Sequence, residues 1–256
     1  MDNKIESKNN LSGEYVGQYY DNFLSTLGTF HSDHRWFEGP VNLIHFNQTK
    51  KTLLTFFNTV SCEKVFEVGG GDGIWTLLYI NVCENLYYLD ISFQMLEQAK
   101  KRLAESISKI SFNQGDFLNN TLEDNIFDTC ISIRNFEYFV DKRKFLSEMH
   151  RILKEKGNLL LVTKSRDYNA HTNLKEKTLH SKQVSVREVI TLLKESGFEI
   201  LNVKPAIFGK LFRFRFARFI SNILHQVLLL IPWKLLPLFL LGFVSESFQI
   251  HAQKKK

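Results

Sequence analysis

The chain has few cysteines, and their wide spacing argues against a cysteine-bound metal site. Only Cys62, Cys83 and Cys130 occur among 256 residues, and none stands in the close pairs typical of a metal site. This sparse use predicts a reducing, cytoplasmic location and no bound metal. Residues 1–10 lack the apolar core of a secretory signal, which gives the same expectation. No repeat and no groove pattern of interleaved basic and aromatic residues is present, so we expect no nucleic-acid partner.

The length and net charge of the chain do not identify its binding partner. A length of 256 residues fits one domain with additions. The formal net charge of +6 is compatible with an anionic membrane surface, a nucleic acid or an acidic substrate. The position of the charge is therefore more informative than its sum.

Two common phosphate-binding motifs are also absent from the glycine-rich stretch that begins at Gly69. The apolar run 64–68 predicts a buried strand that ends in this turn. A dinucleotide fingerprint needs a third glycine where the chain has Ile74, and a P-loop needs a lysine that is missing. The carboxylates of Glu67 and Asp72 would repel a pyrophosphate, so the pattern favours a ligand without phosphates.

The glycine pattern resembles a family motif. The string Glu67-x-Gly69-x-Gly71-x-Gly73 is similar to the first motif of the class I S-adenosylmethionine-dependent methyltransferases, whose cofactor carries a sulfonium and an ammonium group. The resemblance implies an α/β sandwich and assigns Glu67, Gly69 and Gly71 to cofactor binding. It extends by motif over residues 65–162 and by element order over the rest.

Two further strand ends fit an adenosine. Asp90 stands 19 residues beyond Gly71, where a carboxylate can accept two hydrogen bonds from a ribose; its alternative role is to cap the helix that starts at Ser92. By resemblance, Ile91 packs on the adenine or ribose. In the string Gly115-Asp116-Phe117 the family's third motif implies that Asp116 accepts the adenine amino group while Phe117 lies against the ring.

The strand expected over 127–133 leads to the reaction centre. By resemblance, residues 132–135, including Arg134, close around the methionyl end of the cofactor. Many small-molecule members have a Glu-His pair next, whereas this chain has Glu137 and Tyr138. An unperturbed tyrosine is a poor base at neutral pH. The catalytic residues therefore stay open, with Glu137 and Tyr138 as candidates. The alternative is that Tyr138 only orients the acceptor and that no dedicated base exists, because proximity alone can supply much of the rate.

Other expectations concern the surroundings of the sheet. Tyr15, Tyr19 and Phe23 share one helical face in 11–30, and in this family such a helix lies over the active-site mouth. We expect His31, His34 and Trp36 in a loop, as substrate contacts or ordinary surface residues. Helices are expected over 43–58, 74–80, 142–153 and 185–196, a polar loop over 163–181, and strands over 86–89, 110–113, 159–162 and 197–203.

The core fold does not require the segment 209–244. On a helical wheel, aromatic and aliphatic side chains gather on one side, beside a polar and basic flank; the first set is Phe212, Phe216, Phe219, Ile223, Val227 and Leu230, and the flank is Arg215, Arg218, Asn222 and Gln226. This pattern predicts an interfacial helix on an anionic bilayer. Pro232, Lys234 and Pro237 disfavour a membrane span. A lid on the domain and a homodimer contact are the alternatives.

These observations lead to one overall prediction. We expect a three-layer α/β sandwich with a seven-stranded, mainly parallel sheet whose last strand, 247–254, is antiparallel. The expected divisions are a helical cap (1–60), a cofactor-binding core (61–208), a hydrophobic insertion (209–244) and a final strand with a basic tail (245–256). We expect a cytoplasmic methyltransferase of a lipophilic or membrane-presented small molecule, peripheral at the inner face of a membrane through 210–243. A soluble methyltransferase of a sugar or other metabolite and a non-catalytic cofactor-binding partner protein are the alternatives.

Overall fold

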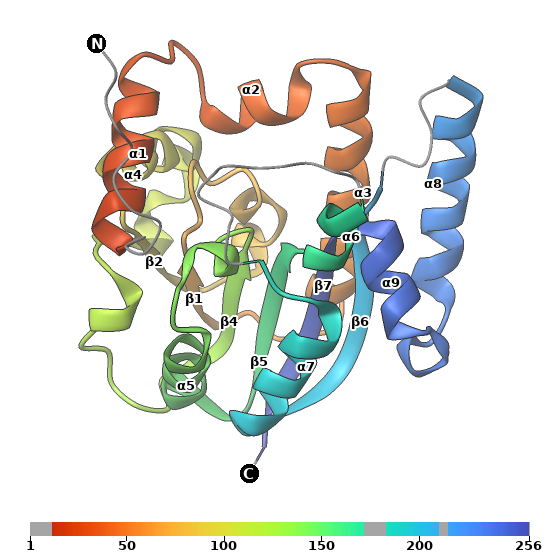
Figure 1. The fold of residues 1–256 in the computed structure, drawn as a ribbon. Helices are drawn as coiled ribbons and strands as arrows, with labels where there is room; N and C mark the ends of the chain where they lie inside the picture. Colours follow the sequence, from red (N-terminus) through yellow and green to blue (C-terminus); the bar gives the residue numbers. More distant parts are fainter. Residues whose placement is uncertain (1–11, 172–182, 210–214, 256) are drawn as a thin grey trace, which may run out of the picture.

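The sheet of the protein has seven strands in the order β3-β2-β1-β4-β5-β7-β6. The structure, a computed structural model, describes residues 12–171, 183–209 and 215–255 (Figure 1). The strand bounds are β1 (Lys64–Val68), β2 (Asn85–Asp90), β3 (Ile110–Gln114), β4 (Phe127–Ile133), β5 (Leu153–Lys164), β6 (Phe198–Phe208) and β7 (Ser245–Lys254). Strands β1 to β5 pair in parallel, and β7 is antiparallel to both β5 and β6. The predicted fold class, including the antiparallel last strand, is confirmed.

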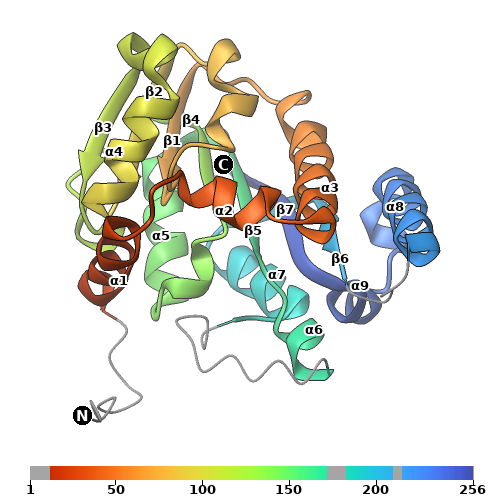
Figure 2. The same ribbon diagram turned by 90° about the horizontal axis from the view of Figure 1, so that it is seen from above.

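Helices cover both faces of this sheet. Their bounds are α1 (Gly13–Ser25), α2 (His31–Phe37), α3 (Pro40–Phe57), α4 (Phe93–Arg102), α5 (Lys142–Ile152), α6 (Arg166–His171), α7 (Val186–Glu195), α8 (Arg215–Leu230) and α9 (Leu238–Val244). Apolar side chains of α3 and α4 pack on one face, and those of α5 and α7 pack on the other. Helices α1 and α2 lie over the carboxyl ends of the parallel strands (Figures 1 and 2).

Strand β1 shows how the two apolar layers are built. Its side chains alternate between the faces, so Val65 belongs to the layer under α3 and α4, whereas Phe66 and Val68 belong to the layer under α5 and α7. Because helices cover both faces, four successive residues of β1 are buried. The strand therefore ends in the glycine turn as a rigid base for whatever lies above it.

The first crossover differs from the helix expected over 74–80. Two short 3₁₀ turns, η1 (Thr76–Leu78) and η2 (Ile80–Val82), occupy this segment. Residues three apart share one side of a 3₁₀ turn. This geometry brings the hydroxyl groups of Thr76 and Tyr79 onto the same carboxylate oxygen of Glu67, at 2.7 and 2.6 Å. The hydrogen bonds favour the tighter turn over an α-helix.

Two expected loops contain helices. The segment with His31, His34 and Trp36 forms α2, whose second residue donates its backbone N–H to the buried carboxylate of Asp72 (2.7 Å). A carboxylate at this end stabilises a helix. The loop expected over 163–181 begins with the end of β5 and then α6, and its residues 172–182 lie outside the described part of the chain.

The insertion leaves and returns at one edge of the sheet. Strand β6 ends at Phe208, which pairs with Ser245 at the start of β7. Between them, α8 packs against β6 and α3, and α9 packs against α6, α7 and β7, with the 3₁₀ turn η6 (Trp233–Leu235) between the two helices (Figure 1). Within the described residues, no helix is both long and apolar enough to cross a membrane.

Candidate active site

A cavity of about 550 Å³ opens above the carboxyl ends of β1, β2 and β4. Its size suits a small-molecule ligand. The glycine turn, η5 (Phe136–Tyr138) and the two N-terminal helices α1 and α2 surround it. The predicted site residues that line it are Gly69, Gly71, Asp90, Ile91, Asp116, Phe117, Arg134, Glu137 and Tyr138.

The glycine turn brings its backbone close to the end of β4. Gly69 has a φ of 62°, a conformation that strains residues with a Cβ, and its N–H bonds to the carbonyl of Leu89 at 2.7 Å. The amide of Asn135 donates to the carbonyl of Val68 and accepts from the hydroxyl of Ser132. A Cβ at Gly69 would lie 2.1 Å from Nδ2 of Asn135. Only glycine fits here without displacing the side chain that joins β1 to β4.

Asp90 ends β2 with its carboxylate held by the backbone. Its Oδ2 accepts from Gly71 N–H and its Oδ1 from Ser92 N–H, both at 2.9 Å. Burial raises the pKa of Asp90 to about 6, although these hydrogen bonds favour the charged form. The N-cap of α4 is Ser92, so the predicted alternative that Asp90 caps this helix is wrong; Asp90 instead holds the N–H of the capping residue and lines the cavity.

Glu67 does not line the cavity. It shares a face of β1 with Val65, and its carboxylate lies beneath the glycine turn, where Oε2 accepts from Thr76 and Tyr79. Burial raises the pKa of Glu67 to about 7, against the effect of these two hydrogen bonds. The structure therefore places Glu67 where it supports the turn from below.

The second carboxylate of the turn, Asp72, is neutralised. Its Oδ2 accepts from Ser32 N–H and lies 3.3 Å from Nη2 of Arg102. Since Glu67 is below the turn and Asp72 is paired with an arginine, the electrostatic argument against a phosphate ligand is not supported by their positions. The pair instead fastens the start of α2 to the turn.

The raised pKa of Glu67 predicts a pH-dependent effect of replacing it with glutamine. Its carboxyl binds more protons in the folded than in the unfolded state between pH about 4.5 and 7, so its contribution to the free energy of unfolding falls as pH rises through that window. Glutamine does not titrate. Between pH 5 and pH 8, we expect the free energy of unfolding of Glu67→Gln to rise by about 3 kcal/mol relative to that of the unsubstituted protein.

Urea unfolding of both proteins at several pH values measures this difference. Because the remaining carboxyl groups titrate in both proteins, their effects cancel to first order in the comparison. Parallel stability profiles for the two proteins would show that the carboxyl of Glu67 ionises in the folded state at its ordinary pKa.

Helix α1 approaches the adenosine end of the predicted site closely. A Cβ at Gly13 would lie 2.8 Å from Cδ1 of Ile91 and 3.3 Å from the carboxylate of Asp116, and one at Gly17 would lie 3.2 Å from the carbonyl of Ile91. Asp21 fixes the helix by accepting from the hydroxyl of Ser92 at 2.5 Å. The sequence signal for this contact is the spacing of Gly13 and Gly17, four residues apart in one helix, and no prediction was based on it.

Asp116 and Phe117 form the part of the wall that follows β3, next to the start of α1. Asp116 starts a 3₁₀ turn, with Oδ1 accepting from Leu118 N–H (3.0 Å) and Oδ2 from the amide of Asn119 (3.0 Å). Phe117 is buried against Phe66 and reaches the cavity wall. Both residues line the cavity, and their contacts with an adenine remain a prediction of the resemblance.

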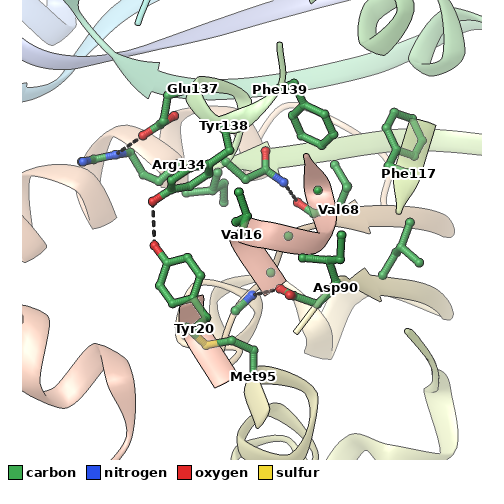
Figure 3. A pocket seen from close by; sticks show the side chains of 18 of the residues that line it. Val16, Tyr20, Val68, Asp90, Met95, Phe117, Arg134, Glu137, Tyr138 and Phe139 are labelled. Atoms are coloured by element: carbon green, nitrogen blue, oxygen red, sulfur yellow. Dashed lines mark hydrogen bonds and ion pairs between the residues drawn. The ribbon is translucent and has the colours of Figure 1, made fainter. Parts of the chain in front are cut away.

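Tyrosine side chains meet on the far side of the cavity. The hydroxyl groups of Tyr20, on α1, and Tyr138, in η5, are 2.6 Å apart (Figure 3). Burial raises the pKa of Tyr20 to about 12 and that of Tyr138 well above 10, so both stay protonated at neutral pH. The predicted helical face of Tyr15 and Tyr19 instead points outward and is about half exposed.

Arg134 and Glu137 form a buried ion pair next to these tyrosines (Figure 3). Nε of Arg134 lies 3.3 Å from Oε1 of Glu137, and Oε2 of Glu137 accepts from the hydroxyl of Thr163 at 3.0 Å. Arg134 itself has a φ of 61°, and its Nη1 is buried with no hydrogen-bond partner among the described residues. The guanidinium of Arg134 and the hydroxyl of Thr163 thus occupy the carboxylate of Glu137, while Nη1 of Arg134 stays unsatisfied by the described residues.

Further residues complete the wall. His31 and Trp36 line the cavity, whereas His34 is outside it and pairs with Glu38 at 2.5 Å. Arg35 and Lys164 also line the cavity, although no sequence motif marked them. Arg35 lies within α2, where a loop was expected, and Lys164 is the last residue of β5, which extends beyond the strand expected over 159–162.

Known proteins resemble this chain in sequence and fold. A family model described as a methyltransferase domain matches residues 66–161. Demethylmenaquinone methyltransferase of Thermotoga maritima is 26% identical over 76% of this chain and 89% of that protein. 2-Methyl-6-phytyl-1,4-hydroquinone methyltransferase 1 of Oryza sativa is 32% identical over 39% of this chain and 30% of its own length. A structure titled as an S-adenosylmethionine-dependent methyltransferase, possible histamine N-methyltransferase, from Thermotoga maritima is 19% identical, with a TM-score of 0.62 over 94% of this chain and 100% of that one.

The cavity wall fits the cofactor of this family. A methionyl carboxylate would satisfy the buried Nη1 of Arg134, and a ribose hydroxyl can donate to the carboxylate of Asp90. The close approach of the glycine turn leaves its backbone open to the ligand, and Ile91 and Phe117 supply apolar surface for an adenine ring. The wall thus offers a polar partner for each end of the cofactor.

Proposed function

Because this chain is a class I, Rossmann-like S-adenosylmethionine-dependent methyltransferase, we propose that its acceptor is a small lipophilic molecule of the quinol type. The names of two relatives support this acceptor class, since one is named for demethylmenaquinone and the other for a phytyl-substituted hydroquinone. An acceptor of this class carries oxygen on an otherwise apolar ring, so a matching site needs few polar groups and a largely apolar wall.

The observation that carries the proposal is the tyrosine pair in an apolar wall. The hydroxyl groups of Tyr20 and Tyr138 lie 2.6 Å apart at the cavity, next to Val16, Phe139 and Val140. Both hydroxyls are protonated at neutral pH and can donate to, or accept from, an oxygen on the acceptor ring. A sugar, in contrast, would present several hydroxyl groups to the apolar side chains.

The residues present support catalysis mainly by positioning. S-adenosylmethionine, when bound, supplies a methyl group on a cationic sulfur. Glu137 is held by Arg134 and Thr163, so it fixes the end of β4 and is poorly placed to abstract a proton from the acceptor. The tyrosine pair orients the acceptor oxygen, and α1 excludes water above it. Holding two reactants in line supplies a large share of the barrier reduction.

Turnover with defined acceptors tests this function. The purified protein is incubated with S-adenosylmethionine and a panel of reduced naphthoquinones and benzoquinones, sugars and amines, and methylated products are identified by mass spectrometry. Methylation of quinols, with sugars and amines inert, is expected. Turnover restricted to a sugar or amine would contradict the acceptor class, and cofactor binding without any turnover would favour a non-catalytic partner protein.

Removing the hydroxyl of Tyr138 should affect the acceptor and not the cofactor. We expect Tyr138→Phe to lower kcat/KM for the quinol by roughly tenfold, the effect of losing one orienting hydrogen bond. The affinity for S-adenosylmethionine, measured by calorimetry, should stay unchanged. Tyr15→Phe, on the exposed side of α1, is the matched control. An unchanged kcat/KM in Tyr138→Phe would remove this hydroxyl from the acceptor site.

A further inference from the structure

The insertion wraps around the β6 edge of the sheet. Helix α8 lies on the side of α3, and α9 lies on the side of α6 and α7 (Figures 1 and 2). The turn η6 between them is fixed to β6, because Nε1 of Trp233 donates to the carbonyl of Leu201 at 2.9 Å. Nζ of Lys204, also in β6, donates to the last carbonyls of α8, those of Leu229 and Ile231. The insertion is therefore a fixed part of the domain.

Helix α8 turns its polar side chains toward the domain. Ser221 and His225 are buried, and His225 Nε2 lies 3.1 Å from the hydroxyl of Thr52 on α3. Asn222 accepts from the amide of Gln48 at 3.0 Å. A helix on a soluble protein normally buries its apolar face instead. The polarity of α8 is thus reversed with respect to the core.

The outer face of the insertion is apolar. We use this name for the exposed side chains of Phe219, Ile223, Val227 and Leu230 on α8, Leu235 in η6, and Phe239 and Phe243 on α9. Phe219 is 62% exposed, Leu230 84%, Leu235 73% and Phe239 70%. Large exposed apolar side chains gathered on two helices and their connection indicate an interaction surface. The alternative of a lid that buries this face on its own domain is wrong.

Charge identifies the partner of this face. Residues 200–245 contain no aspartate or glutamate and six basic residues, Lys204, Lys210, Arg213, Arg215, Arg218 and Lys234. Their charge of +6 equals the formal net charge of the whole chain. Four of them, at 210–218, stand at or just before the start of α8, and Lys234 is exposed in η6 between the two apolar helices. By sequence the insertion is therefore cationic and carries no acidic residue, and Lys204 is the one of the six that is buried among the described residues.

We propose that the outer face of the insertion docks on a lipid bilayer that carries anionic lipids. Apolar side chains enter the boundary of the acyl chains while basic residues meet the headgroups. A second copy of the chain is a poorer partner, because a two-fold symmetric contact would bring the same cations together. Docking at the surface also agrees with the path of the chain, since both ends of the insertion join neighbouring strands, β6 and β7.

Vesicle binding by the full chain tests the docking. Flotation with vesicles of phosphatidylcholine and phosphatidylglycerol should recover the protein in the lipid fraction. Pure phosphatidylcholine vesicles should recover less, and high salt should release part of the bound protein. The double variant Leu230→Ser/Phe239→Ser should lower the partition coefficient at least tenfold. Lys234→Glu should lower binding to the anionic vesicles only.

The control variant removes two other exposed apolar side chains that lie outside the insertion. Val82 and Ile107, on η2 and η3 (Ala104–Lys109), are 67% and 52% exposed, so Val82→Ser/Ile107→Ser should bind vesicles like the unsubstituted protein. Calorimetry with S-adenosylmethionine shows that each variant is folded. Equal vesicle binding by the Leu230/Phe239 variant, or no binding by the unsubstituted protein, would overturn the proposal.

Two further outcomes separate the related hypotheses. A dimer in analytical ultracentrifugation that the Leu230/Phe239 variant dissociates, without vesicle binding, would assign the face to a second copy and overturn the lipid partner. The docking proposal does not depend on the acceptor. Loss of docking with intact turnover of a water-soluble quinol would leave the proposed function standing, whereas vesicle binding without quinol turnover would overturn only that function.

Discussion

Replacing Asp90 with alanine should weaken the binding of S-adenosylmethionine by roughly 1–3 kcal/mol, or about 5- to 150-fold in the dissociation constant. The side chain ends β2 in the cavity wall, and its carboxylate is the acceptor there for a ribose. It also accepts from the backbone of Gly71 and Ser92, so its removal loosens the turn that approaches the ligand. Calorimetry measures the loss.

Two variants sharpen this result. Asp124→Ala removes an exposed carboxylate that pairs with Arg151, away from the cavity, and should leave the affinity unchanged. Since the pKa of Asp90 is about 6, the cofactor should also bind more weakly below pH 6, where the protonated carboxyl no longer accepts two hydrogen bonds as an anion. Asp90→Asn should flatten that part of the pH profile. An unaltered affinity in Asp90→Ala would remove the residue from the site.

Gly69→Ala should destabilise the fold by about 2–5 kcal/mol and abolish cofactor binding. The methyl group adds the strain of a positive φ to an overlap with the side chain of Asn135, which holds β4 against β1. Chemical unfolding gives the stability, and calorimetry gives the cofactor affinity of the folded fraction.

The chain supplies controls that separate the two causes. Gly39 has a φ of +95° and a ψ of 160°, a glycine-only conformation, but no atom within 4 Å of an added Cβ, so Gly39→Ala isolates the backbone strain, about 1–3 kcal/mol. Gly28 has neither feature, and Gly28→Ala should be nearly neutral. If Gly69→Ala cost no more than Gly39→Ala, the contact with Asn135 would not constrain the turn.

The sheet was predictable because its strands are buried on both faces. Continuous apolar runs such as 159–162 mark such strands, and glycine or acidic residues mark the carboxyl ends of several of them. The strand that contains Ser247 to Lys254 alternates in polarity and was placed as the antiparallel last strand, as the structure has it. In these strands the residue pattern of the segment agrees with its position in the sheet.

Elements held by a few specific hydrogen bonds were not predictable. The turns η1 and η2 depend on the bonds of Thr76 and Tyr79 to Glu67, and the start of α2 depends on Asp72. Both partners come from other segments, and residue patterns do not report such contacts. The reversed polarity of α8 is a similar case, because only the structure shows that His225 faces Thr52.

The candidate site likewise contains residues whose positions the sequence could predict and residues whose positions it could not. Asp90 and Asp116 end strands whose order the motifs set, so their place in the cavity wall could be expected. Glu67 lies in the middle of a strand, where the alternation of β1 turns it to the face of Val65 and Tyr79. The partnership of Tyr20 with Tyr138 spans 118 residues and depends on how α1 sits over the sheet.

The insertion also covers part of the β6 edge of the sheet. Strand β6 is the terminal strand of the sheet, and an open terminal strand invites pairing with another chain. Here side chains take up its free carbonyls: the indole of Trp233 binds that of Leu201, and Thr52 binds that of Pro205, a residue with no N–H to offer. Cutting out the insertion would uncover this strand and promote edge-to-edge aggregation. The proposed docking on a membrane must therefore be tested by surface point substitutions, since truncation would confuse loss of docking with misassembly.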